Sequence, residues 1–311
     1  MKVRRRLQVP TGDILIVDGQ YGKLEMLSLG DYGKGINLCR KPVVHGPLLP
    51  LEEKWVITIY TQYGCSMGCA FCDVPKVGPG RNASLPDLYN QIRTGLHLHQ
   101  EITASRRLNI HFARMGEPTW NPNVLDCGTW IREHLSPMHY CHPVVSTMMP
   151  RRNLQLMNFI DGWMRIKNQV FEGEAGLQLS INSTDEIERR AMFNDSALSL
   201  GEIAYVMRHA LPIGRKITLN FAVAGYDVDP EKLLRFFSPE RYVCKLTPMH
   251  KTAAALANGV LTAGDYTTPE PYLHIEARLK AAGYEVLVFI ASREEDESRI
   301  TCGNAILAEA R

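Results

Sequence analysis

Short runs of hydrophobic and β-branched residues alternate along the chain with longer segments whose apolar positions recur at helical spacing. The strand-like runs cover 55–60, 108–113, 143–148, 177–182, 216–223, 242–248 and 284–291. The helical segments begin near Leu85, Asn123, Arg152, Ser199, Pro230 and Pro269. Strands that are apolar on both faces and alternate with helices predict a parallel sheet with crossover helices. About six such units are too few for a closed eight-unit barrel, so the predicted α/β fold is a partial (β/α)6 TIM-like barrel.

Residues 1–54 have a different character, with several glycines and prolines and two weaker strand signals, "DILIVDG" and "KLEML". We expect residues 1–54 to form a small β-rich N-terminal extension that packs on a barrel core at 55–311. The basic start "MKVRRR" is expected to be a solvated tail, with contact to phosphate as the alternative.

Composition narrows the class of protein. A chain of 311 residues with 45% hydrophobic content can bury a large core, and a net charge of +2 gives no strong attraction to nucleic acid. No run approaches the length of a membrane span and no secretory leader is visible, so we expect a cytoplasmic protein away from membranes. Eight cysteines are too few for a disulfide scaffold, and a tight cluster of them in a reducing compartment indicates metal binding or catalysis.

Three cysteines, Cys65, Cys69 and Cys72, follow the first predicted barrel strand. Thiolates suit zinc, copper(I) or iron–sulfur clusters. A structural zinc site closes with four ligands, usually as two pairs, whereas three thiolates from one loop can hold three irons of a [4Fe–4S] cluster and leave the fourth open. The sequence therefore predicts a [4Fe–4S] cluster at the mouth of the barrel, with a zinc knuckle or incidental thiols as the alternative.

The spacing Cys-x-x-x-Cys-x-x-Cys, with Phe71 before the last cysteine, resembles the signature of the radical S-adenosylmethionine superfamily. This resemblance implies that the open iron chelates the methionine part of S-adenosylmethionine. It also implies an electron donor such as flavodoxin or ferredoxin, because the cofactor is cleaved reductively to a 5′-deoxyadenosyl radical. Gly116 and Glu117 resemble the superfamily's Gly-Glu-Pro element, in which backbone and carboxylate hold the aminoacyl end of the cofactor.

Near the other end, "SRITCGNAIL" at 298–307 resembles the Cys-Gly-(Gln/Asn) motif of the RNA adenine carbon-2 and carbon-8 methyltransferase (RlmN/Cfr-like) family. The resemblance extends from about 56 to 307. It implies that Cys302 accepts a methyl group from one cofactor molecule. A radical made from a second molecule then takes a hydrogen from that methyl, and the carbon is added to an adenine ring of RNA. Arg299 would favour the Cys302 thiolate, and a buried structural cysteine is the alternative.

The same resemblance assigns further residues. It places Ser146, Ser180 and Asn182 along the cofactor site, although the family has His where Asn182 stands. It also assigns His250, which occupies the place of a family Asn, to cofactor binding, and Glu25 matches a glutamate proposed as a general base.

Two features depart from the family. Its resolving cysteine, which forms a disulfide with the methyl-carrying one, is replaced by Thr58, and a hydroxyl cannot form that bond. Cys39 or Cys141 is a candidate substitute. Only 64 residues precede Cys65, whereas the family carries an N-terminal RNA-binding domain of roughly a hundred residues, which leaves open an RNA other than ribosomal RNA.

The expected function is methylation of an adenine carbon in RNA by a radical S-adenosylmethionine enzyme. Two alternatives remain open at this point. One is a divergent radical enzyme that acts on a small molecule or peptide. The other is a protein that binds the cluster without turnover, which the missing thiol at Thr58 permits.

Overall fold

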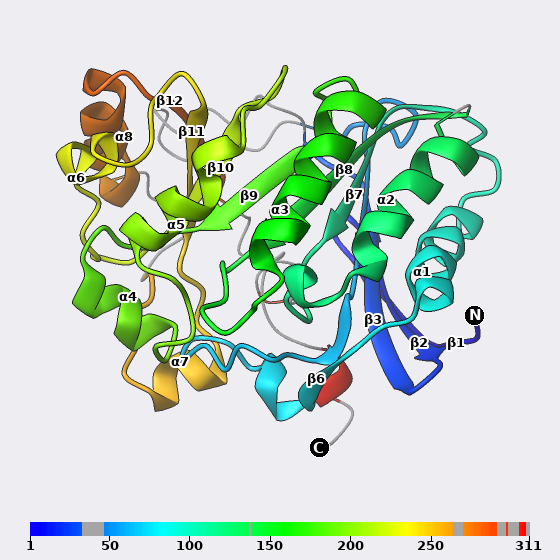
Figure 1. Cartoon of the computed structure of the whole chain (residues 1–311). Coiled ribbons are helices and arrows are strands. Elements are labelled where there is room, and N and C mark those ends of the chain that lie inside the picture. The colour runs from blue at the N-terminus through cyan, green and yellow to red at the C-terminus, as the bar shows by residue number, and fades with distance from the viewer. Residues whose placement is uncertain (33–46, 137, 264–269, 291–296, 298–304, 309–311) are drawn as a thin grey trace.

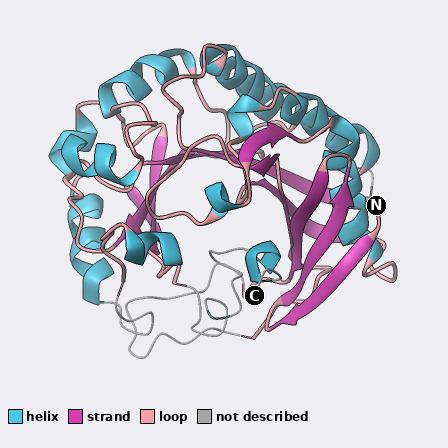
Figure 2. Ribbon diagram, turned by 90° about the horizontal axis from the view of Figure 1, so that it is seen from below, coloured by secondary structure: helices cyan, strands magenta, loops and turns pink. Residues whose placement is uncertain are grey.

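A computed structural model (Figure 1) describes residues 1–32, 47–136, 138–263, 270–290, 297 and 305–308 of the chain. Its centre is one curved sheet with the strand order β1-β2-β3-β4-β7-β8-β9-β10-β11-β12. Seen from below in Figure 2, the strands form an incomplete ring and the helices lie around its outer side. The predicted α/β partial barrel is therefore confirmed.

Seven parallel strands make the barrel, and each coincides with a strand predicted from the hydrophobic pattern. They are β4 (Trp55–Ile59), β7 (Ser105–Phe112), β8 (His139–Thr147), β9 (Gly176–Ser180), β10 (Ile217–Val223), β11 (Tyr242–Pro248) and β12 (Glu285–Val288). Successive side chains on a strand point to opposite faces. On β10, Leu219 and Phe221 are fully buried in the core shared with the helices, while Asn220 and Ala222 turn to the barrel interior and are only partly buried.

Six helices begin within a few residues of the predicted positions. They are α1 (Leu85–His97), α2 (Asn123–His134), α3 (Leu156–Arg165), α5 (Leu200–Val206), α6 (Pro230–Leu234) and α8 (Glu270–Ala281). Ser84 and Ser199 each close a capping box at a helix start, which satisfies backbone N–H groups that have no partner within the helix. The hydrophobic pattern did not reveal the short helices α4 (Glu186–Met192), α7 (Ala253–Ala257) and α10 (Ala305–Ala308).

Among the residues with a described position, no helix combines the length and apolar character that crossing a bilayer requires.

The N-terminal residues extend the barrel sheet. An antiparallel meander of β1 (Val3–Val9), β2 (Gly12–Gly19) and β3 (Gly22–Leu29) joins β4 through pairing of β3 with β4. The basic start is exposed to solvent as expected, but it is not a tail, because β1 is a strand whose Arg4 and Arg6 form ion pairs of 2.8 and 2.6 Å with aspartates of β2. The predicted domain boundary between 54 and 55 stays a prediction.

Candidate active site

The three cysteines lie on one loop that follows β5 (Gln62–Gly64), a short strand paired with β6 (Pro79–Asn82). Gly64 permits the close approach of these strands, because a Cβ on its backbone (φ +78°) would lie 2.1 Å from the Gly78 carbonyl oxygen. Distant residues fasten the loop. The Thr252 hydroxyl donates to the Phe71 carbonyl (2.6 Å), and the Asn258 amide donates to the Ala70 carbonyl (2.8 Å).

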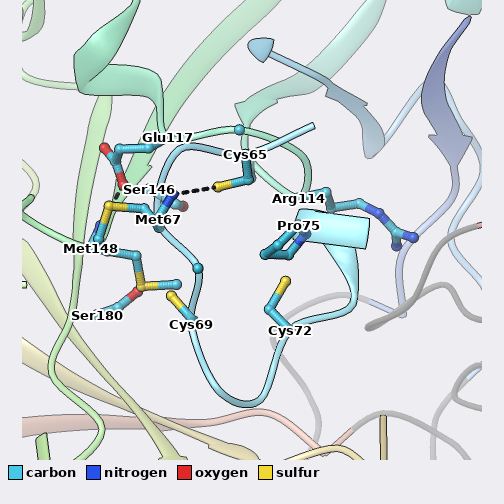
Figure 3. Close-up of a pocket in the computed structure, with 13 residues that line it drawn as sticks. Cys65, Met67, Cys69, Cys72, Pro75, Arg114, Glu117, Ser146, Met148 and Ser180 are labelled. Carbon is cyan, nitrogen blue, oxygen red and sulfur yellow. Dashed lines mark hydrogen bonds between the residues drawn. The ribbon is translucent and has the colours of Figure 1, made fainter. Parts of the chain in front are cut away.

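One cavity of about 100 Å³ unites most of the predicted site (Figure 3). Seven of the residues chosen from the sequence line it: Cys65, Cys69, Cys72, Gly116, Glu117, Ser146 and Ser180. They come from the cysteine loop, the segment after β7, and strands β8 and β9, whose carboxyl ends meet at the same edge of the barrel. The three-cysteine motif and the Gly-Glu-Pro motif therefore belong to one site, although 44 positions separate Cys72 from Gly116.

The thiols are poorly hydrated. Burial raises the pKa of Cys65 to about 11 and raises that of Cys69 well above its ordinary value, with the neighbouring Cys72 and Cys65 adding to the shift at Cys69. A second hydrophobic cluster, which includes Met67, Met192 and Phe193, packs against the cysteines. Deprotonation of thiols in such surroundings requires a positively charged partner, and metal coordination provides one.

The donor set fits a [4Fe–4S] cluster. No three His, Cys, Asp or Glu side chains of the described residues are close enough together to hold a single metal ion. In a cluster, each thiolate binds a different iron, so its sulfur ligands stand farther apart than ligands around one ion. Three soft ligands from one loop, an apolar shell and a cavity beside them agree with that kind of group.

Gly116 and Glu117 are fixed tightly beside the loop. A Cβ on Gly116 (φ +92°) would lie 2.6 Å from the Gln62 backbone nitrogen, so only glycine fits there. Glu117 is 2% exposed and accepts hydrogen bonds from the Thr119 hydroxyl (2.8 Å) and the Met148 N–H (2.8 Å). Burial raises the pKa of Glu117 in spite of these bonds. An ammonium group in the cavity would stabilise its charged form.

Gln62 is a site residue that sequence reasoning missed. It is 1% exposed, and its side-chain amide donates to Asn82 Oδ1 (2.8 Å) and Ser66 Oγ (3.1 Å). Its side-chain carbonyl accepts from the Glu117 N–H (3.0 Å). Gln62 thus connects the cysteine loop with the Gly-Glu-Pro segment. A polar residue just beyond the carboxyl end of a barrel strand was the available signal.

Two residues assigned to the cofactor site do not line this cavity. Asn182 is 3% exposed with φ +63°, and its side-chain oxygen accepts from the Ala222 N–H (3.1 Å), so it connects the ends of β9 and β10. His250 follows β11, two residues beyond Pro248. Their roles as cofactor ligands stay predictions.

Glu25 lies on β3 and is fully buried. One carboxylate oxygen pairs with Arg114 (3.0 Å), a residue that lines the cavity. The other accepts from the N–H groups of Ala305 (2.6 Å) and Ile306 (3.2 Å), the first residues of α10. The carboxylate therefore anchors α10, and its role as a general base stays a prediction.

Only some of the residues that bear on release of a covalent adduct are described by the structure. Cys302, Arg299 and Cys39 lie outside the described residues. Thr58 lies on the interior face of β4, whereas Ile57 and Ile59 point to the outer face. In the pairing of β4 with β7, Thr58 is the partner of His111. Cys141 is 5% exposed within the core between sheet and helices, and burial raises its pKa to about 12. This position argues against Cys141 as the substitute thiol, because it lies on the outer face of the sheet.

Comparison with known proteins adds relatives. No protein-family model matches the chain. A dual-specificity RNA methyltransferase RlmN of Sulfurovum is 40% identical over 70 residues, which are 22% of this chain and 19% of the relative. A second RlmN, from Sorangium cellulosum, is 25% identical over 260 residues, covering 81% of this chain and 62% of the relative. The chain thus spans less than two thirds of the length of these relatives.

Among solved structures, a radical SAM methyltransferase from Sphaerobacter thermophilus superposes with a TM-score of 0.66 at 19% identity. The match covers 94% of this chain and 78% of that protein. At this identity the likeness concerns the fold, and it includes nearly the whole chain.

Proposed function

We propose that the chain is a member of the RlmN/Cfr-like radical S-adenosylmethionine family and an enzyme that methylates an adenine carbon in RNA. The observation that carries this proposal is the single cavity that gathers three cysteine thiols, the Glu117 carboxylate and two serine hydroxyls. The names of the RlmN relatives support RNA as the substrate. A cytoplasmic location agrees with such a substrate.

Different residues of the cavity would bind the cluster and the cofactor. Cys65, Cys69 and Cys72 would hold a [4Fe–4S] cluster, and Gly116 and Glu117 would hold the aminoacyl end of S-adenosylmethionine. When bound and reduced by a donor such as flavodoxin or ferredoxin, these groups supply a carbon radical that abstracts hydrogen.

Other side chains of the cavity would orient the cofactor and exclude water. The Glu117 carboxylate pairs with an ammonium group, and its own hydrogen bonds to Thr119 and Met148 fix its direction. Hydroxyls of Ser146 and Ser180 offer hydrogen bonds from the interior face of the sheet. Met67 and Met148, which also line the cavity, exclude water that would otherwise quench a reactive carbon centre.

We assign the methyl-carrying role to Cys302. The support is its Cys-Gly-Asn sequence context and the position of Ala305, three residues further along, whose N–H binds Glu25. Glu25 in turn pairs with Arg114 at the cavity. A tryptic peptide that contains Cys302 should be about 14 Da heavier than the unmodified peptide in protein from cells rich in the cofactor.

The proposal is tested with anaerobically reconstituted protein, S-adenosylmethionine, a reductant and bulk RNA from cells that lack the gene. Mass spectrometry should detect 5′-deoxyadenosine and a methyladenosine that depends on the protein. Cys65→Ala should lose iron and both products, whereas Cys127→Ala, a change in the core on α2, should keep them. Cluster-replete protein that makes no 5′-deoxyadenosine would contradict radical chemistry, and 5′-deoxyadenosine without methyladenosine would contradict RNA as the substrate.

A further inference from the structure

A lysine of strand β11 faces the interior of the barrel. Lys245 lies in the middle of β11, between Cys244 and Leu246, which are fully buried on the opposite face. Among the described residues, no carboxylate forms an ion pair of 4.0 Å or less with its ammonium, which lies 5.7 Å from the centre of the Phe289 ring. The carboxylate whose charge acts on the Lys245 ammonium is that of Asp31, which already pairs with Lys54 at 2.7 Å. A partly buried ammonium without a partner costs stability, and such groups concentrate at functional sites.

The strand register connects Lys245 with the cavity at the cysteines. Lys245 pairs with Asn220 of β10, and Asn220 pairs with Ser180 of β9, so the three side chains form one row on the interior face. Ser180 lines the cavity. Neighbouring strands are about 5 Å apart, so the backbone of Lys245 lies about 10 Å from that of Ser180. This span is comparable to the length of one nucleotide.

The neighbours of Lys245 add hydrogen-bonding capacity and positive charge. The side-chain oxygen of Asn220 is buried and has no hydrogen-bond partner. Burial lowers the pKa of His111 to about 3, and the charge of Lys245 is the next cause, followed by Arg215, Lys54 and Arg107. His111 is therefore neutral, and the surrounding charges favour an anion in the barrel interior.

We propose that Lys245, with Asn220 beside it, binds a phosphate of the substrate nucleotide inside the barrel, next to the cofactor site. The ammonium supplies the charge, and Asn220 hydrogen-bonds to the sugar or base. This inference rests on the proposed function, because it assumes a nucleotide substrate. The carboxylate of S-adenosylmethionine is another possible anion, and the experiment separates the two.

The probes are adenosine 5′-monophosphate and adenosine, and their affinities are measured by equilibrium dialysis with anaerobically reconstituted protein. The monophosphate should bind at least about 10-fold more tightly than adenosine, because a charge-assisted hydrogen bond is at stake. Lys245→Met should abolish this preference, and Lys245→Arg should keep most of it. Lys232→Met, which removes a surface lysine paired with Asp227 at 2.8 Å, should leave it unchanged.

Two further readouts separate a binding lysine from a structural one. The affinity for S-adenosylmethionine should be the same in Lys245→Met as in the unmodified protein. The melting temperature should rise in this variant, because an unpaired ammonium in the interior is replaced by an apolar chain of similar length. If Lys245→Met fails to fold, Lys245→Gln takes its place.

Three results would overturn the inference: equal affinity for the two probes in the unmodified protein, an unchanged preference in Lys245→Met, or loss of S-adenosylmethionine binding in that variant. If these variants still make 5′-deoxyadenosine and methyladenosine, the proposed function stands without the phosphate site. A Lys245-dependent preference in protein that makes no methyladenosine would leave the phosphate site and refute the proposed function.

Discussion

At the scale of single residues, His142 on β8 predicts how the folded protein responds to acid. Burial lowers its pKa from 6.5 to about 4, and the charge of Arg107 contributes to the shift. The unfolded chain therefore binds a proton that the folded chain refuses, so stability falls as the pH drops from about 6.5 towards 4. Between pH 7 and pH 5 this one group should cost about 2 kcal/mol of the unfolding free energy.

Urea unfolding at the two pH values measures this loss. His142→Gln should unfold with a free energy that depends less on pH than that of the unmodified protein, by about 2 kcal/mol over the same interval. His209→Gln, a change at an exposed histidine of the segment after α5, is the matched control and should leave the dependence as it was. Identical pH dependence in the His142 variant and the unmodified protein would show that His142 is protonated in the folded state.

Gln62 gives a second prediction at this scale. Gln62→Leu removes a donor and an acceptor that connect Asn82, Ser66 and Glu117, and leaves buried polar groups without partners. We expect a loss of about 3 kcal/mol in unfolding free energy. The reconstituted variant should also retain less iron, because the cysteine loop loses its connection to the Gly-Glu-Pro segment.

Urea unfolding and iron analysis check these two effects, with the exposed Gln100→Leu as control. Full iron content in a destabilised Gln62→Leu would show that Gln62 supports the fold without positioning the loop.

At the scale of elements, Glu25 makes α10 part of the barrel. Its carboxylate joins the first two N–H groups of α10 to Arg114, so Glu25→Gln leaves that guanidinium without its buried carboxylate. Breaking such a pair should cost about 3 kcal/mol. Amide hydrogen exchange in the peptide covering 305–308 should become faster.

The control for α10 is Glu53→Gln, which breaks an exposed pair with Arg106 and should change stability by less than about 0.5 kcal/mol. Unchanged exchange at 305–308 in Glu25→Gln, together with lost turnover, would instead support Glu25 as the general base. Anchoring of α10 by Glu25 therefore predicts faster exchange at 305–308 in Glu25→Gln, and a role as general base alone predicts unchanged exchange.

The hydrophobic pattern predicted the elements that bury regular apolar faces. The side chains of strands such as β10 point alternately to the core and to the barrel interior. A capping residue, such as Ser84 for α1, marks the start of a helix in the sequence. The hydrophobic pattern could not predict β1, whose outer positions are arginines stabilised by aspartates of β2, because that stabilisation depends on pairing across strands. It did not predict the five-residue helix α7 for a related reason. The N–H groups of Ala253 and Ala254 at its start donate to Asp73 beside the cysteine loop, 180 and 181 residues away.

The candidate site was predictable where one short motif carries its chemistry. Cys65 and Glu117 were recognisable from local sequence and line one cavity. Gln62 and Lys245 were not, since a glutamine or lysine within a strand-rich stretch has no chemical signature of its own. The fold gives Gln62 its hydrogen-bond partners, and it places the Lys245 ammonium at no ion-pair distance from any carboxylate of the described residues. The anchoring of α10 by Glu25 joins residues 280 positions apart and depends wholly on the tertiary fold.

At the scale of the whole molecule, the first and last parts of the chain meet at the barrel. β3 carries Glu25 and pairs with β4, where Leu27 lies opposite Thr58, and α10 packs on β2 and β3. The proposed reaction involves these same parts, because it assigns the methyl-carrying role to Cys302 and release of the product to the residue at 58.

The last prediction follows from that arrangement. If Cys302 becomes attached to the substrate, Thr58 cannot release it, since release by this route requires a thiolate that forms a disulfide. RNA covalently bound to the protein should therefore accumulate and be visible as a slower-migrating species on denaturing gels after turnover. Thr58→Cys should remove that species, because residue 58 already faces the barrel interior beside His111.

The controls distinguish the thiols. Cys141→Ala should not change the amount of adduct, because Cys141 is packed in the outer core, whereas an increase in Cys39→Ala would identify Cys39 as the resolving thiol. Val56→Cys places a thiol on the same face of β4 but two residues earlier, and tests whether position as well as chemistry is required. Free methylated RNA from a Cys39→Ala and Cys141→Ala double variant, with no adduct at any time, would mean that the product leaves by chemistry that needs neither thiol.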